Sequence, residues 1–287
     1  MHKNNKHSKD YNFKALIKDS PQLAEFVFES KYGKDTIDFA NPKAVKSLNS
    51  ALLKTHYGIQ YWDFPYDNLC PPIPGRVDYI HHLADLLGEK ANNPKVLDVG
   101  TGASCIYPIL GASEYQWSFV ATEIDQTSFN FARKHVNENS FLKSKIEIRF
   151  QENKDNIFEG VVGKHEQFDL TMCNPPFHRS RQEAMEGTKR KEKNLKYANA
   201  TKKEAVKNFG GTSNELWCKG GEVSFVRKMI LETVERPKLS TWFTTLVSKK
   251  ESLKSLGYTL EQNNAAEVKV IPMQHGNKIS RILAWRF

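Results

Sequence analysis

Short apolar runs alternate with helical stretches from Lys95 to the end of the chain, and this alternation constrains the fold more than any other sequence feature. It is typical of strand–helix–strand units, which assemble into a mainly parallel sheet with helices on its faces. The predicted strands are 95–99, 118–122, 145–150, 168–173 and 240–247, and the predicted helices are 127–138 and 222–234. Two further strands, near 267–271 and 279–287, are joined by a short link, which predicts an antiparallel hairpin at the sheet edge.

The part of the chain before this sheet reads as helical. Ser20-Pro21 and Asn41-Pro42 each place a capping side chain before a proline, as at the start of a helix, and apolar residues at helical spacing follow both. A proline-rich turn at 70–76 then leads into a third amphipathic helix at 77–87. The expected units are a helical N-terminal region, 1–74, and a sheet-based domain, 75–287.

Charge and apolar content narrow the possible partners and compartments. The sequence has 42 Lys and Arg against 33 Asp and Glu, a formal charge of +9, which favours polyanionic partners through phosphate neutralisation. No apolar run approaches the ~20 residues needed to cross a bilayer, and no secretory signal is evident, so we expect a cytoplasmic protein. The four cysteines lack paired spacing, which predicts neither a metal site nor a disulfide framework.

One polar, basic segment, 179–213, interrupts the predicted domain. A loop of this length inside a compact domain is typically functional or disordered. On charge alone, a solvated surface insertion fits it equally well. The basic residues singled out are Lys189, Arg190, Lys191, Lys193, Lys196, Lys202 and Lys203.

The first chemical motif begins in the strand 95–99 and runs from Asp98 to Ser104. It contains Gly100 and Gly102, which let the backbone approach a ligand where a β-carbon would clash. Cys105 stands where a dinucleotide fingerprint has its third glycine. Taken alone, the turn therefore also fits a tight strand-to-helix connection.

The second motif is Glu123, directly after the strand 118–122. Adjacent parallel strands end at the same crevice, where a carboxylate can accept hydrogen bonds from both hydroxyls of a ribose. This position indicates a ligand that contains a nucleoside. Taken alone, Glu123 also fits an exposed position beside a helix N-terminus.

The third motif, Asn174-Pro175-Pro176-Phe177, follows the strand 168–173. Two prolines stiffen the backbone and remove two N–H donors, so the oxygens of Asn174 and Pro175 are available to accept from one planar –NH2 group. Phe177 offers a ring face for stacking. The pattern predicts an exocyclic amine or a carboxamide as substrate. Its position opposite the glycine turn disfavours a simple Asx-Pro turn that only ends a strand.

Taken in order, these motifs resemble the class I S-adenosylmethionine-dependent methyltransferases that methylate amines. Over nearly the whole chain, the sequence is similar to the 23S ribosomal RNA adenine-N6 methyltransferases of the large-subunit methyltransferase F type and to their eukaryotic methyltransferase-like relatives. The segments that carry this likeness are 72–76, 98–108, 121–125, 174–177 and 220–222.

The resemblance implies a Rossmann-like α/β fold with a seven-stranded, mostly parallel sheet and one antiparallel strand. It also implies methyl transfer from S-adenosylmethionine, without a metal, to N6 of one adenine in 23S ribosomal RNA, position 1618 in the RNA numbering of that family. The implied cofactor-binding residues are Arg76, at the methionine carboxylate, together with Asp98, Gly100, Thr101, Gly102, Ser104, Glu123 and Asn174. The implied catalytic residues are Asn174, Pro175, Pro176 and Phe177.

The same resemblance places the basic segment 179–213 directly after the catalytic motif, where it is expected to bind RNA phosphates. The N-terminal region is expected to face the RNA. The expected partner is 23S ribosomal RNA or a large-subunit assembly intermediate, bound by a monomer with no membrane contact. Three alternatives stay open: a protein-glutamine methyltransferase, a DNA adenine methyltransferase, and a non-catalytic RNA-binding module.

Overall fold

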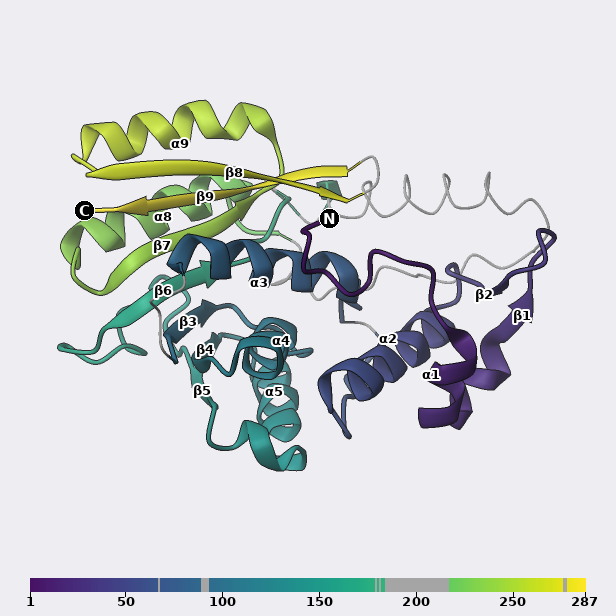
Figure 1. The fold of residues 1–287 in the computed structure, drawn as a ribbon. Coiled ribbons are helices and arrows are strands. Elements are labelled where there is room, and N and C mark those ends of the chain that lie inside the picture. Colours follow the sequence, from purple (N-terminus) through teal and green to yellow (C-terminus); the bar gives the residue numbers. More distant parts are fainter. Residues whose placement is uncertain (67, 89–92, 179, 181, 184–216, 276–277) are drawn as a thin grey trace.

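The computed structural model describes residues 1–66, 68–88, 93–178, 180, 182–183, 217–275 and 278–287. Its largest element is a seven-stranded sheet of order β5-β4-β3-β6-β7-β9-β8 (Figure 1). Only β9 runs antiparallel to its neighbours, which confirms the predicted class I methyltransferase sheet. The strands are β3 (Lys95–Val99), β4 (Ser118–Glu123), β5 (Ile146–Phe150), β6 (Phe168–Cys173), β7 (Ser240–Val247), β8 (Glu267–His275) and β9 (Lys278–Arg286).

Helices cover both faces of this sheet. Neighbouring strand residues point to opposite faces, as Val96 and Leu97 do in β3, and each face packs into its own apolar core. One core joins the sheet to α3, α4 and α5, and the other joins it to α8 and α9. These helices are α3 (Ile73–Leu87), α4 (Ile106–Tyr115), α5 (Gln126–Glu138), α8 (Gly221–Glu235) and α9 (Lys250–Gln262). A short 3-10 helix, Ser140–Leu142, follows α5.

Most of the predicted strands have the expected bounds. The bounds of β3, β6 and β7 agree with the prediction, because strands buried on both faces read as continuous apolar runs. The predicted C-terminal hairpin is confirmed, with β8 at the sheet edge and β9 paired between β7 and β8. The third helix begins four residues earlier than expected, at Ile73. The sequence patterns did not predict the helices α4 and α9.

The N-terminal region contains α1 (Phe13–Asp19), β1 (Val27–Glu29), β2 (Asp35–Ile37) and α2 (Pro42–Tyr57). Asn41 caps α2 as predicted, because its side-chain oxygen accepts from the backbone N–H of Lys43 at 3.0 Å. The predicted helix after Ser20-Pro21 was wrong. Residues Pro21–Phe26 form a 3-10 helix, the Ser20 side chain makes no capping bond, and the β-branched Val27 begins β1 instead.

The N-terminal region packs directly on the sheet-based part of the chain. Its apolar residues share one core with α4 and with one face of the sheet. The indole N–H of Trp62 donates to the carbonyl of Ser104 at 2.8 Å, just before α4. The region is therefore held against the loop that follows β3. Among the described residues, no helix is both long enough and apolar enough to span a membrane.

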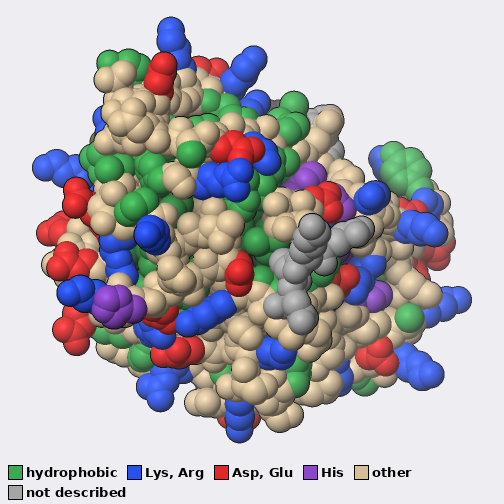
Figure 2. All heavy atoms as spheres, turned by 60° about the vertical axis from the view of Figure 1, so that its left-hand side comes forward, with side chains coloured by type: hydrophobic (Ala, Val, Ile, Leu, Met, Phe, Trp, Pro, Cys, Tyr) green, Lys and Arg blue, Asp and Glu red, His purple; other side chains and the backbone are tan. Residues whose placement is uncertain are grey.

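Charged side chains are mixed on the face seen in Figure 2. There, Lys and Arg lie interspersed with Asp and Glu instead of gathering in one basic patch (Figure 2). On the hairpin of β8 and β9, Glu267 forms ion pairs with both Lys269 and Arg286. The net charge of +9 is therefore not concentrated on this side of the molecule.

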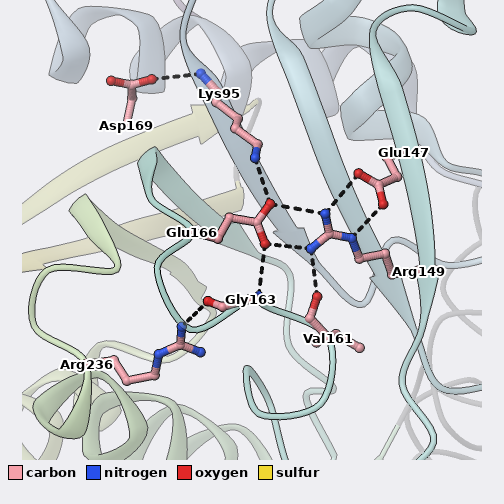
Figure 3. A network of polar contacts seen from close by, with 8 residues as sticks. All are labelled: Lys95, Glu147, Arg149, Val161, Gly163, Glu166, Asp169 and Arg236. Carbon is pink, nitrogen blue, oxygen red and sulfur yellow. Dashed lines mark hydrogen bonds and ion pairs between the residues drawn. The ribbon is translucent and has the colours of Figure 1, made fainter.

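A polar network ties the β5–β6 connection to the sheet (Figure 3). Glu166 accepts from Arg149 at 2.7 Å, from Lys95 at 2.7 Å and from the backbone N–H of Gly163 at 3.1 Å. Arg149 also donates to Glu147 and to the carbonyl of Val161. The hydrogen bond from Arg149 is the main cause that lowers the pKa of Glu166 to about 2.

Replacing Glu166 with Gln should lower the free energy of unfolding at pH 7 by about 1 to 2 kcal/mol, because Arg149 and Lys95 lose a charged partner that is only partly exposed. Because the folded protein lowers the pKa of Glu166, the ionised carboxylate stabilises the fold at pH values above 4.5, its ordinary pKa. This stabilisation is lost as pH falls toward 2. Urea unfolding at pH 7 and pH 3 measures the difference, with the exposed Glu138→Gln as control. An equal difference at both pH values would contradict this account.

Candidate active site

A cavity of about 510 Å³ opens where β3, β4 and β6 end. This volume lies in the range of small-molecule sites, roughly 300 to 1,000 Å³. Most of the site residues expected from the motifs and from the resemblance line it together. They are Arg76, Gly100, Thr101, Gly102, Ser104, Glu123, Asn174, Pro175 and Pro176.

Parallel pairing brings these residues to one edge of the sheet. In the register of the sheet, Val99 of β3 lies beside Thr122 of β4 and beside Cys173 of β6. The residues that follow them, Gly100, Glu123 and Asn174, therefore lie at the same level of the sheet. Strands β3 and β6 end just before this level, and β4 ends at it with Glu123. Parallel sheets bind ligands at such carboxyl ends.

The glycine turn after β3 is held closely against the end of β4. Gly100 and Gly102 have φ of 72° and 68°, left-handed values that favour glycine. The backbone N–H of Gly102 donates to Oε2 of Glu123 at 2.8 Å, and Oε1 accepts from Ile124 and Asp125 at 2.8 and 2.9 Å. The Glu123 carboxylate is thus fixed in orientation at the cavity wall, and each oxygen has further acceptor capacity.

Arg76 reaches the cavity from the first turn of α3. Its guanidinium donates to the Tyr107 hydroxyl at 2.6 Å and stacks on that ring. Its Nε lies buried without a hydrogen-bond partner in the described part of the chain. This remaining donor suits an anionic group such as a carboxylate.

The Asn-Pro-Pro-Phe motif follows β6, the neighbour of β3, and lines the same cavity as the glycine turn. Asn174, Pro175 and Pro176 line the cavity, whereas Phe177 is half-buried just beyond its lining. The side-chain oxygen of Asn174 is shielded from solvent and accepts no hydrogen bond within the described ranges. Leaving a buried acceptor unpaired is costly, so this oxygen is poised for a donor from a ligand.

Asp98 lies beneath the glycine turn and outside the cavity lining. Its side chain is only 1% exposed, and neither oxygen makes a well-formed hydrogen bond to another described residue. Burial raises the pKa of Asp98 to about 7; the Thr101 hydroxyl opposes this shift and the charge of Glu123 adds to it. A cation near the turn would stabilise the ionised form.

Several lining residues lie outside the set of predicted site residues. The loop after β5 contributes Gln151, Lys154, Asp155, Asn156 and Ile157. The others are Leu69, Pro71, Tyr107, Trp217, Cys218, Lys219, Ser224, Phe225 and Lys228. Among the described residues, no group of His, Cys, Asp and Glu side chains is arranged to hold a metal ion.

The basic segment itself cannot be placed against this cavity. Its singled-out residues, from Lys189 to Lys203, lie outside the described residues. Described residues on either side of the segment, His178 and Trp217, meet beside the motif. His178 pairs with Trp217 in a parallel bridge, and the N–H of Cys218 donates to the carbonyl of His178 at 3.2 Å.

Comparison with known proteins finds similarity over the full chain. A family profile described as RNA methyltransferase matches residues 1–287. The "Ribosomal RNA large subunit methyltransferase F" proteins of Colwellia psychrerythraea and Bacteroides fragilis are 50% and 49% identical, covering 100% of this chain and 99% and 98% of theirs.

Solved structures also resemble the chain. The human METTL16 catalytic domain in complex with MAT2A 3′UTR hairpin 1 has a TM-score of 0.84 and 31% identity, covering 100% of this chain and 95% of that one. The N-terminal domain of human METTL16 in complex with SAH has a TM-score of 0.80 and 29% identity, covering 100% and 98%.

Replacing Asp98 with Asn should change the pH dependence of stability. A carboxyl whose folded pKa is raised to about 7 contributes stability that is full below the ordinary value of 3.8 and is lost as pH rises through 7. Asp98→Asn removes this loss. As pH rises from 4 to 8, the free energy of unfolding of the variant should therefore increase, relative to that of the wild type, by on the order of a few kcal/mol. Urea unfolding at both pH values tests this, with the exposed Asp35→Asn as control. A pH-independent difference would contradict it.

Proposed function

The chain belongs to the RNA methyltransferase family, and on that premise we propose that it transfers a methyl group from S-adenosylmethionine to N6 of one adenine in 23S ribosomal RNA. The names of relatives that match the whole chain support the ribosomal substrate, and the SAH complex of METTL16 supports the cofactor. The observation that carries the proposal is the unpartnered Asn174 oxygen, which lines the same cavity as the glycine turn and Glu123.

The cavity residues fit this cofactor. The buried, unpaired Nε of Arg76 suits the methionine carboxylate, and the close backbone of Gly100 to Gly102 suits the methionine chain. The fixed carboxylate of Glu123 suits the two ribose hydroxyls, and the loop after β5 lines the same cavity, where it can contact the cofactor's adenine. When bound, S-adenosylmethionine supplies a methyl group activated by its sulfonium and leaves as the neutral thioether.

The motif orients the accepting amine. The Asn174 side-chain oxygen and the Pro175 carbonyl each accept one hydrogen of N6, which turns the nitrogen lone pair toward the methyl carbon. The two prolines hold this geometry and bring no competing N–H. As the N–C bond forms and the C–S bond breaks, positive charge develops on N6, and the two oxygens stabilise it until the proton passes to solvent.

The target adenine must leave its stack to reach this motif, at a cost of a few kcal/mol. Stacking on the half-buried ring of Phe177 would return about 1 to 3 kcal/mol of that cost. Proteins read RNA sequence mainly in loops and bulges, where bases are already partly unstacked. Such a site in 23S ribosomal RNA, or in a large-subunit assembly intermediate, is the substrate we infer for a cytoplasmic monomer.

Replacing Asn174 with Ala should lower turnover by at least ~100-fold, because the amine loses one of its two acceptors and its alignment. Cofactor affinity should fall far less than turnover, because Asn174 is one of several implied cofactor contacts and Arg76, the glycine turn and Glu123 are intact. Transfer of labelled methyl to ribosomal RNA gives the turnover, and calorimetry gives the cofactor affinity. The exposed Asn130→Ala on α5 is the matched control.

Competition between substrates separates this proposal from the other methyltransferase classes. Structured ribosomal RNA should be methylated in preference to duplex DNA and to protein glutamine, and Asn174→Ala should abolish the RNA signal. Preferred methylation of DNA or protein would overturn the RNA assignment. Full turnover by the Asn174 variant would overturn the role of the motif.

Neutralising basic residues of the segment 179–213 should weaken RNA binding and leave cofactor binding unchanged. Each phosphate that the variant no longer neutralises should reduce the slope of log affinity against log salt by about 0.7 to 1. Changing Lys189, Lys191 and Lys193 together to Gln, with exposed lysines of α9 as controls, tests this in filter-binding titrations. An unchanged slope would show that the segment does not bind the phosphates.

A further inference from the structure

The described wall of the cavity beside the Asn-Pro-Pro-Phe motif includes Trp217. It pairs with His178, the residue directly after the motif, and Cys218 donates to the same His178 carbonyl. Trp217 lines the cavity together with Asn174, Pro175 and Pro176. The indole is therefore held on the substrate side of the site, next to the groups that accept the amine.

The indole N–H of Trp217 is shielded from solvent and has no hydrogen-bond partner among the described residues. In two buried tryptophans the same group has a partner: Trp62 donates to Ser104 at 2.8 Å, and Trp285 donates to Thr233 at 3.0 Å. An indole N–H can only donate. A buried donor left unpaired costs free energy, which is recovered when a ligand supplies an acceptor.

Adenine needs such a donor in this site. Its amine donates to the Asn174 and Pro175 oxygens, but the ring nitrogens on either side of the amine-bearing carbon, N1 and N7, are acceptors. The backbone of Pro175 and Pro176 supplies no donor to them, because neither residue has an N–H. Guanine carries a hydrogen on N1 and an oxygen in place of the amine, so a fixed donor at N1 and acceptors at the amine position would both disfavour it.

We propose that Trp217 is a specificity-determining residue that donates its indole N–H to a ring nitrogen flanking the target amine. This inference rests on the proposed adenine substrate. The residue would also supply an apolar ring edge to the base. It would thus complete a recognition set in which two oxygens accept from the amine and one N–H donates to the ring.

The test uses full-length enzyme and an RNA hairpin that carries adenosine, 1-deazaadenosine or 7-deazaadenosine at the methylated position. Trp217→Phe keeps an aromatic ring and removes the donor, and its coupling with the deaza substrates separates loss of the donor from loss of ring area. It should lower kcat/KM on adenosine RNA about tenfold, with unchanged cofactor affinity. One deaza substrate should cost the wild type a similar factor, and Trp217→Phe should add no further loss on that substrate. The analogue that shows this coupling identifies the nitrogen.

Controls separate a failed inference from a failed function. Trp242→Phe changes a tryptophan outside the cavity lining and should keep wild-type discrimination. Independent losses from Trp217→Phe and from both analogues would overturn the inference. Equal use of all three substrates by the wild type would also overturn it, even if Trp217→Phe did not fold. If the wild type leaves adenosine RNA unmethylated, the proposed function itself fails.

Discussion

The parallel pairing of β3 with β4 on one side and β6 on the other is the constraint on which the site depends. It places the residues after Val99, Thr122 and Cys173 at one level of the sheet. The hydrogen bond from Gly102 to Glu123 then joins two of the three strand ends. A slip of the β6 register by one residue would turn its side chains to the opposite face and move Asn174 away from the glycine turn.

Burial determined how well the sheet could be predicted. Strands buried on both faces, such as β3 and β6, produce continuous apolar runs bounded by turn residues, so their bounds agree with prediction. The same reasoning placed the glycine turn, Glu123 and Asn174 together, because strand order follows from the βαβ pattern and ligands bind at strand ends. The cavity lining agrees with that expectation.

Other features depend on tertiary packing that local patterns do not carry. Helix α4 is buried along most of its length, contains Pro108 and Gly111, and begins after Cys105 in a left-handed conformation without a capping side chain. None of these is a usual helix signal. The apolar residues after Ser20 suggested a helix, but the 3-10 helix ends within six residues and β1 follows. The proposed role of Trp217 depends on its bridge to His178 across a long insertion, which sequence spacing cannot reveal.

The central claim is that this cavity presents acceptors to one adenine amine of ribosomal RNA beside a sulfonium methyl donor. Mass mapping of methylated nucleotides in 23S ribosomal RNA, from cells with and without the protein, tests it most directly. One adenine should carry N6-methyl only when the protein is present. Methylation that is the same in both samples, or a difference confined to another nucleotide or another atom of the base, would contradict it.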